Sequence, residues 1–136
     1  MEIPPADTPV VCDLSTAPDT AQERLAEYQQ LFRRALVGRE RHAVGIRFRF
    51  RAQEGIEAWV RDLAQREHAC CAFMAFDVAT VGDEVHMDVA VSDNDDARAV
   101  LDLFYELPET GTEDPAALAD RYRDHRLQFI NGDSVS

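Results

Sequence analysis

The residues of this chain best suited to chemistry are its three cysteines and one of its four histidines. Cys70 and Cys71 are adjacent, and His68 precedes the pair by one intervening residue. Thiolate and imidazole groups are the ligands that soft metal and metalloid ions prefer. Cys12 lies far away in the sequence, so the number of sulfur ligands depends on whether the fold brings Cys12 to the pair.

Local electrostatics favour metal binding over a cysteine nucleophile. Thiols become reactive at helix N-termini or beside cations, where the thiolate is stabilised. Cys70 and Cys71 instead fall at the predicted C-terminus of a helix and follow Glu67. The helix dipole and the carboxylate both disfavour a thiolate there. Coordination to a metal ion deprotonates a thiol outright and therefore reverses this preference.

The candidate ligands are Cys70, Cys71, Cys12 and His68, with Glu67 and Phe73 as their surroundings. Three thiolates suit As(III), Hg(II), Zn(II) or Cu(I), and the imidazole would add a nitrogen ligand. Structural zinc sites usually separate their cysteines in sequence, so an ion softer than zinc is favoured. The alternative is that the cysteines are small apolar core residues, since free cysteine is among the most buried residue types.

Composition excludes several classes of protein. The chain has 136 residues, 46% hydrophobic and 29% charged, which predicts one globular domain. Its formal charge of −12 argues against a nucleic-acid surface, because phosphate binding needs clustered cations. No apolar run approaches the roughly 20 residues that cross a bilayer. The N-terminus lacks the pattern of a signal peptide, so a cytoplasmic location without structural disulfides is expected.

The elements that must position these residues follow from hydrophobic periodicity and turn signals. Residues 44–51 alternate cleanly and predict a half-buried strand. The spacing of Thr20 and Glu23 predicts a capping box that opens a helix, with Gly38 as its stop. A helix is expected from about residue 54 to the cysteine pair, and another between the caps at 92–96 and Pro108. Further strands are expected at residues 9–14, 73–81 and 85–91, the last two joined at Gly82.

This order predicts an α+β fold, with a small sheet of about four strands and the helices on one face. The order is strand, helix, strand, helix, strand, strand and helix, followed by a C-terminal helix. We expect a flexible tail at residues 1–8, a single domain at 9–107 and a linker at 108–115. Residues 116–136 would form the C-terminal helix, from Pro115 through about residue 129, and a frayed tail.

The chain resembles a family of small proteins of high-GC bacteria that carry a Glu-x-x-Cys-Cys-x-Phe segment between a helix and a strand. The segment here consists of Glu67, Cys70, Cys71 and Phe73. The resemblance spans roughly residues 10–107 and includes Cys12-Asp13-Leu14, Ile46-Arg47-Phe48 and Leu103-Phe104. Many relatives have proline after the cysteine pair, where this chain has Ala72. Similar segments are attached to MerR-like metal-responsive regulators, so the resemblance implies a metal or metalloid context.

Three functional hypotheses follow. The first is binding of a soft ion (Hg, As, Cu or Zn) for sensing, buffering or sequestration, without direct DNA contact because no helix-turn-helix precedes the domain. The second is a thiol-dependent enzyme, either redox or organomercurial-cleaving, with Glu67 or Asp13 as the acid. The third is a structural or interaction domain with inert buried cysteines, which would form a homodimer through its sheet edge.

Overall fold

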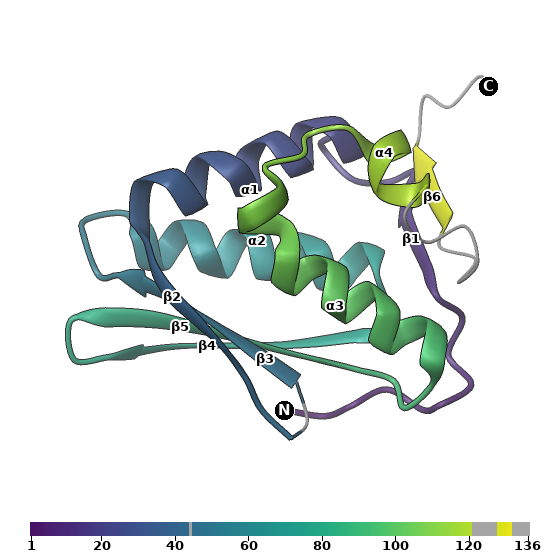
Figure 1. Cartoon of the computed structure of the whole chain (residues 1–136), viewed down its shortest axis with the longest axis horizontal. Helices are drawn as coiled ribbons and strands as arrows, with labels where there is room; N and C mark the ends of the chain where they lie inside the picture. Colours follow the sequence, from purple (N-terminus) through teal and green to yellow (C-terminus); the bar gives the residue numbers. More distant parts are fainter. Residues whose placement is uncertain (44, 121–127, 132–136) are drawn as a thin grey trace.

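The computed structural model describes residues 1–43, 45–120 and 128–131. Helices and strands follow one another along the chain, and the helices lie on one side of the main sheet (Figure 1). In chain order the elements are β1 (Val11–Leu14), α1 (Ala21–Ala35), β2 (Leu36–Arg41), β3 (Gly45–Arg51), α2 (Ile56–Cys70), β4 (Met74–Val81), β5 (Glu84–Val91), α3 (Asp95–Thr110), α4 (Pro115–Asp120) and β6 (Gln128–Asn131).

The main sheet has four antiparallel strands in the order β2-β3-β5-β4. Alternate residues of β3 and β5 are paired across the sheet, so that Ile46 faces Val89 and Phe48 faces Met87. All four side chains are buried, because this face carries α1, α2 and α3 (Figure 1). The predicted α+β fold with helices on one face is therefore confirmed. The predicted hairpin also forms, with Gly82 at φ 62° in the turn between β4 and β5.

The sequence predicts that the strand at residues 9–14 belongs to the main sheet. This prediction is wrong. Its last four residues form β1, which pairs in parallel with β6 to form a separate two-stranded sheet. The fourth strand of the main sheet is β2, which the sequence pattern does not predict. The predicted helix stop at Gly38 is wrong, because α1 ends at Ala35 and β2 begins at Leu36, with a β-bulge between Leu36 and Gly38. Because β2 is an edge strand rich in charged residues, it lacks the apolar alternation that identifies a buried strand.

Two helix starts agree with the sequence, and the end of α3 differs from it. Thr20 and Glu23 form the predicted capping box at the start of α1. Asn94 accepts the amide of Ala97 at 2.8 Å and begins α3. The predicted end of α3 before Pro108 is wrong, because the helix continues to Thr110.

The part of α3 around Pro108 is held by a side chain of α1. Proline lacks an amide hydrogen and normally disrupts a helix interior. The buried side chain of Gln29, on α1, donates to the carbonyl of Leu107 at 2.9 Å and to that of Thr112 at 3.1 Å. Gly111 then adopts the left-handed conformation that terminates the helix, at φ 63°. The predicted linker at 108–115 is consequently shortened to residues 111–114.

The C-terminal segment also differs from the expectation. The helix α4 begins at Pro115, as predicted, and the side chain of Asp114 accepts the amide of Ala116 at 3.0 Å. Residues 128–131 form the strand β6, so a continuous helix through about residue 129 is wrong. Residues 121–127 and 132–136, the latter within the expected frayed tail, lie outside the described part of the chain. Near the other terminus, Asn94 donates to the carbonyl of Ala6 at 2.9 Å.

Aromatic side chains from three elements form the centre of the core. The ring centroids of Phe32 and Phe48 are 5.4 Å apart, and those of Phe48 and Phe104 are 5.3 Å apart. Tyr28 packs edge-on against Phe104 at 5.2 Å. This cluster fixes α1 and α3 over β3.

Among the described helices, none has the length and apolar character to cross a membrane.

Candidate functional site

The cysteines are positioned where the end of α2 meets β1. Cys70 is the last residue of α2, and the amide of Cys71 still donates to the carbonyl of Glu67 at 2.8 Å. The backbone then turns, and Phe73 enters the core with no exposed surface. Cys12 lies in β1, which packs against α2 (Figure 1). All three cysteines are buried.

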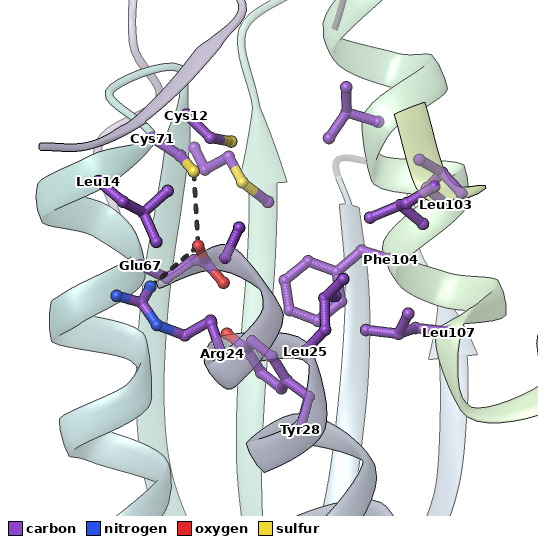
Figure 2. A pocket seen from close by; sticks show the side chains of 14 residues that line it. Cys12, Leu14, Arg24, Leu25, Tyr28, Glu67, Cys71, Leu103, Phe104 and Leu107 are labelled. Carbon is purple, nitrogen blue, oxygen red and sulfur yellow. Dashed lines mark hydrogen bonds and ion pairs between the residues drawn. The ribbon is translucent and has the colours of Figure 1, made fainter. Parts of the chain in front are cut away.

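Cys12 and Cys71 come together at the end of a cavity, and Figure 2 shows their sulfur atoms on the same side of it. The Cys71 sulfur is 3.5 Å from Oε2 of Glu67, to which the thiol donates. A hydrogen bond with Cys12 raises the pKa of the Cys71 thiol well above its usual value, and burial and the negative charge of Glu67 act in the same direction. Cys71 is therefore a neutral thiol at physiological pH.

Cys70 faces a different partner. Its sulfur lies 3.9 Å from Nη2 of Arg24, on α1, and its side chain does not line the cavity that Cys71 reaches. Burial raises the pKa of the Cys70 thiol, and the hydrogen bond from Arg24 opposes that rise. The two adjacent thiols therefore point in different directions, as expected for successive residues near a helix end, which lie roughly 100° apart around the axis.

The structure does not bring His68 to the thiols. The His68 side chain is exposed, and its Nδ1 atom lies 2.9 Å from the carbonyl of Met74. Its ring lines a surface groove together with Arg61 and Ala64, apart from the cavity of Cys12 and Cys71. Of the predicted ligands, the fold thus joins Cys12 to Cys71, turns Cys70 toward Arg24 and leaves His68 at the surface.

A buried arginine that the sequence analysis did not single out connects α1 to the thiol site. The Arg24 side chain is only 4% exposed. Its Nε atom donates to Asp19 Oδ2 at 2.6 Å, Nη2 donates to Asp19 Oδ1 at 2.7 Å, and Nη1 donates to Glu67 Oε2 at 3.2 Å. Oε2 of Glu67 therefore accepts from both Arg24 and Cys71. Helical spacing is the sequence signal that indicates burial of Arg24, since position 24 precedes the core residue Tyr28 by one helical turn.

The network continues along the interface between α1 and α2. Arg66 donates to Asp19 Oδ2 at 2.9 Å and to Glu27 at 2.8 Å. Glu27 also accepts the indole N–H of Trp59 at 2.7 Å. The Arg24 pair lowers the pKa of Asp19, whose charge is thereby kept at neutral pH. These contacts hold the two helices in register and fix Glu67 beside the thiols.

The cavity has a volume of about 70 Å³ and two chemically different sides. Thiols, Glu67 and Arg24 form one side, and leucine, valine and phenylalanine side chains form most of the other (Figure 2). The Tyr28 hydroxyl lies between them and makes no hydrogen bond of normal geometry within the described residues. Burial and the charge of Glu67 raise the pKa of Tyr28, which therefore remains protonated.

This arrangement offers two thiol ligands and a proton acceptor. Within residues 1–43, 45–120 and 128–131, no three His, Cys, Asp or Glu side chains gather as a metal-binding group. The thiols that line this cavity are Cys12 and Cys71, and Glu67 is in contact with one of them. Comparison of the chain with protein-family models, with curated proteins and with solved structures finds no match.

Proposed function

We propose that the protein binds a soft ion of low coordination number, Hg(II) in particular, through the sulfur atoms of Cys12 and Cys71. The observation that supports this proposal is that two buried thiols from separate elements line the same end of one cavity (Figure 2). Thiolates select soft ions, and Hg(II) is satisfied by two of them in a linear arrangement. As(III) and Zn(II) need three or four ligands, which the described residues do not bring together.

Charge also favours Hg(II) over Cu(I). Two thiolates and Hg(II) form a neutral unit, whereas two thiolates and Cu(I) keep one negative charge. An uncompensated charge in an apolar surrounding is costly, and the nearby cation, Arg24, is already paired with Asp19 and Glu67. Because Arg24 is already paired, the thiol end of the cavity suits the neutral complex better.

In this proposal Glu67 accepts the proton that the Cys71 thiol loses when the ion binds. Its Oε2 atom accepts the Cys71 thiol hydrogen bond at 3.5 Å and is the nearest base for that proton when the sulfur binds an ion. Arg24 holds the carboxylate in place at 3.2 Å. The same binding step would serve sensing, buffering or sequestration. The raised pKa values of Cys70 and Cys71 argue against the thiol-enzyme hypothesis, which needs a thiolate nucleophile.

Native mass spectrometry of the reduced protein with Hg(II), in the presence of a competing small thiol, tests the proposal. We expect one ion per chain in the wild type, and loss of the bound ion in Cys12→Ser and in Cys71→Ser. Cys70→Ser is the matched control, because Cys70 is also buried and is adjacent to Cys71 but does not line the cavity. Retention by Cys12→Ser, or loss in Cys70→Ser alone, would contradict the assignment.

A further inference from the structure

The cavity beside the thiol pair extends beyond what a bare ion requires. An ion between two sulfur atoms occupies only the end formed by Cys12 and Cys71. The remaining wall is apolar and is formed by Leu25 on α1 together with Val100, Leu103, Phe104 and Leu107 on α3 (Figure 2). A wall of this kind fits a hydrocarbon group rather than water, because apolar cavities exclude water.

The size of the cavity limits that group. A cavity of about 150 Å³ is sufficient to hold benzene, and the present one has about 70 Å³. One or two carbon atoms therefore fit in the space, and a phenyl ring does not. The group must also be attached to an atom that binds sulfur, because the thiols lie at the end of the same space.

We propose that the site takes a monoalkylmercury cation with a methyl or ethyl substituent, the mercury on the Cys71 sulfur and the alkyl group against the apolar wall. This inference rests on the proposed soft-ion function of the same site. Binding is a ligand exchange in which the mercury–halide or mercury–thiolate bond breaks and a mercury–Cys71 bond forms. The thiol proton passes to Glu67 and leaves with the displaced anion, while the carbon–mercury bond stays intact and nothing is oxidised or reduced. A linear sulfur–mercury–carbon unit directs the alkyl group away from the sulfur and into the cavity.

Competition titrations with methyl-, ethyl- and phenylmercury chloride, and with Hg(II), test this inference. Each affinity is measured relative to glutathione, so that the intrinsic strength of the mercury–sulfur bond cancels. We expect ethylmercury to bind about fourfold more tightly than methylmercury, the factor that corresponds to one buried methylene group. Phenylmercury should bind at least roughly tenfold more weakly than ethylmercury, since the ring overfills the space. Equal relative affinities for the three cations would overturn the inference.

Val100 provides a matched pair of variants, because its side chain lines the cavity from α3, an element that carries neither thiol. Val100→Leu fills part of the space and should lower the relative affinity for ethylmercury about fourfold or more. Val100→Ala enlarges the space and should raise the relative affinity for phenylmercury. Both variants should bind Hg(II) as the wild type does, and thermal unfolding checks that each is folded.

The outcomes separate the two proposals. If Hg(II) binds but the alkyl affinities are insensitive to substituent size and to Val100, the cavity has no role in recognition and only this inference fails. If neither Hg(II) nor an alkylmercury cation binds more tightly than to glutathione, the proposed soft-ion function fails with it.

Discussion

The buried ion-pair network predicts that Arg24→Met destabilises the protein strongly. Removing one partner of a buried pair costs about 3–5 kcal/mol, because the remaining charge is left uncompensated. Asp19 would keep a second cation, since Arg66 donates to the same carboxylate at 2.9 Å. Glu67 would keep no cation among the described ion pairs, and its side chain is 13% exposed. We therefore expect a loss near the lower end, about 3 kcal/mol.

Urea denaturation measures this loss, with Arg61→Met as the matched control. Arg61 lies on the same helix as Glu67 and pairs with Glu57 four residues earlier, but the two side chains are 51% and 48% exposed. An exposed pair of this type contributes only about 0.5 kcal/mol. The midpoint of unfolding should shift in both variants without a change in slope, and far more in Arg24→Met.

A double variant tests the reason for the loss. Glu67→Gln removes the charge that Arg24→Met leaves unpaired, so the double variant should lose about 1.5 kcal/mol less than the sum of the two single losses. Additive losses, or a loss in Arg24→Met no larger than in Arg61→Met, would refute the reasoning. In either case Arg24 would not be the residue that holds Glu67 at the thiol site.

Three further outcomes follow from the structure. The two adjacent cysteines at the end of α2 have raised pKa values, so alkylation of the native protein at pH 7 should be slow and should accelerate on unfolding; a thiol modified within seconds would contradict this. The pKa of Asp19 is lowered in the folded state, so the stability that Asp19 contributes is complete above the unfolded pKa of 3.8 and is lost as the pH falls through the folded pKa. Thermal unfolding between pH 6 and pH 2 should show this loss of stability. In Asp19→Asn the loss should be smaller. Gly45→Ala should destabilise the protein markedly, since a Cβ atom there would lie 2.0 Å from a backbone carbonyl oxygen of β5. Gly38→Ala should cost little stability, because the nearest atoms belong to the flexible end of an arginine side chain. Equal shifts in the unfolding temperature of the two variants would contradict the comparison.

Much of the fold could be predicted because its signals are local. The alternation of Ile46, Phe48 and Phe50 identified the central strand, and the spacing of Thr20 and Glu23 identified the start of α1. Each of these patterns depends on residues within one element. The α+β class followed from the order of such elements.

The errors occurred where long-range contacts decide the structure. The strand β2 carries Arg39 and Arg41, whose partners Glu109 and Asp102 lie on α3, far away in the sequence. The strand β6 forms only because β1 offers a parallel partner from the other end of the chain. Neither contact has a signature in the nearby sequence.

The site was predictable in its residue types but not in its geometry. The adjacent Cys70 and Cys71 suggested a pair, whereas the helix end separates their directions and places Cys71 with Cys12. The contribution of Arg24 depends on Glu67 reaching it from another helix at 3.2 Å. Residue spacing predicts the faces of one helix or strand at a time. It does not predict which elements come together in space, so the contact of three elements at this site could not be predicted from it.

X-ray absorption spectroscopy at the mercury edge, on the reduced protein loaded with one equivalent of Hg(II), tests the central claim most directly. We expect two sulfur ligands in a linear arrangement, in the wild type and equally in Cys70→Ser. Cys12→Ser should lose the two-sulfur signature, because the second ligand is then missing. Three or four sulfur ligands, a nitrogen ligand, or a spectrum altered in Cys70→Ser would contradict the pairing of Cys12 with Cys71.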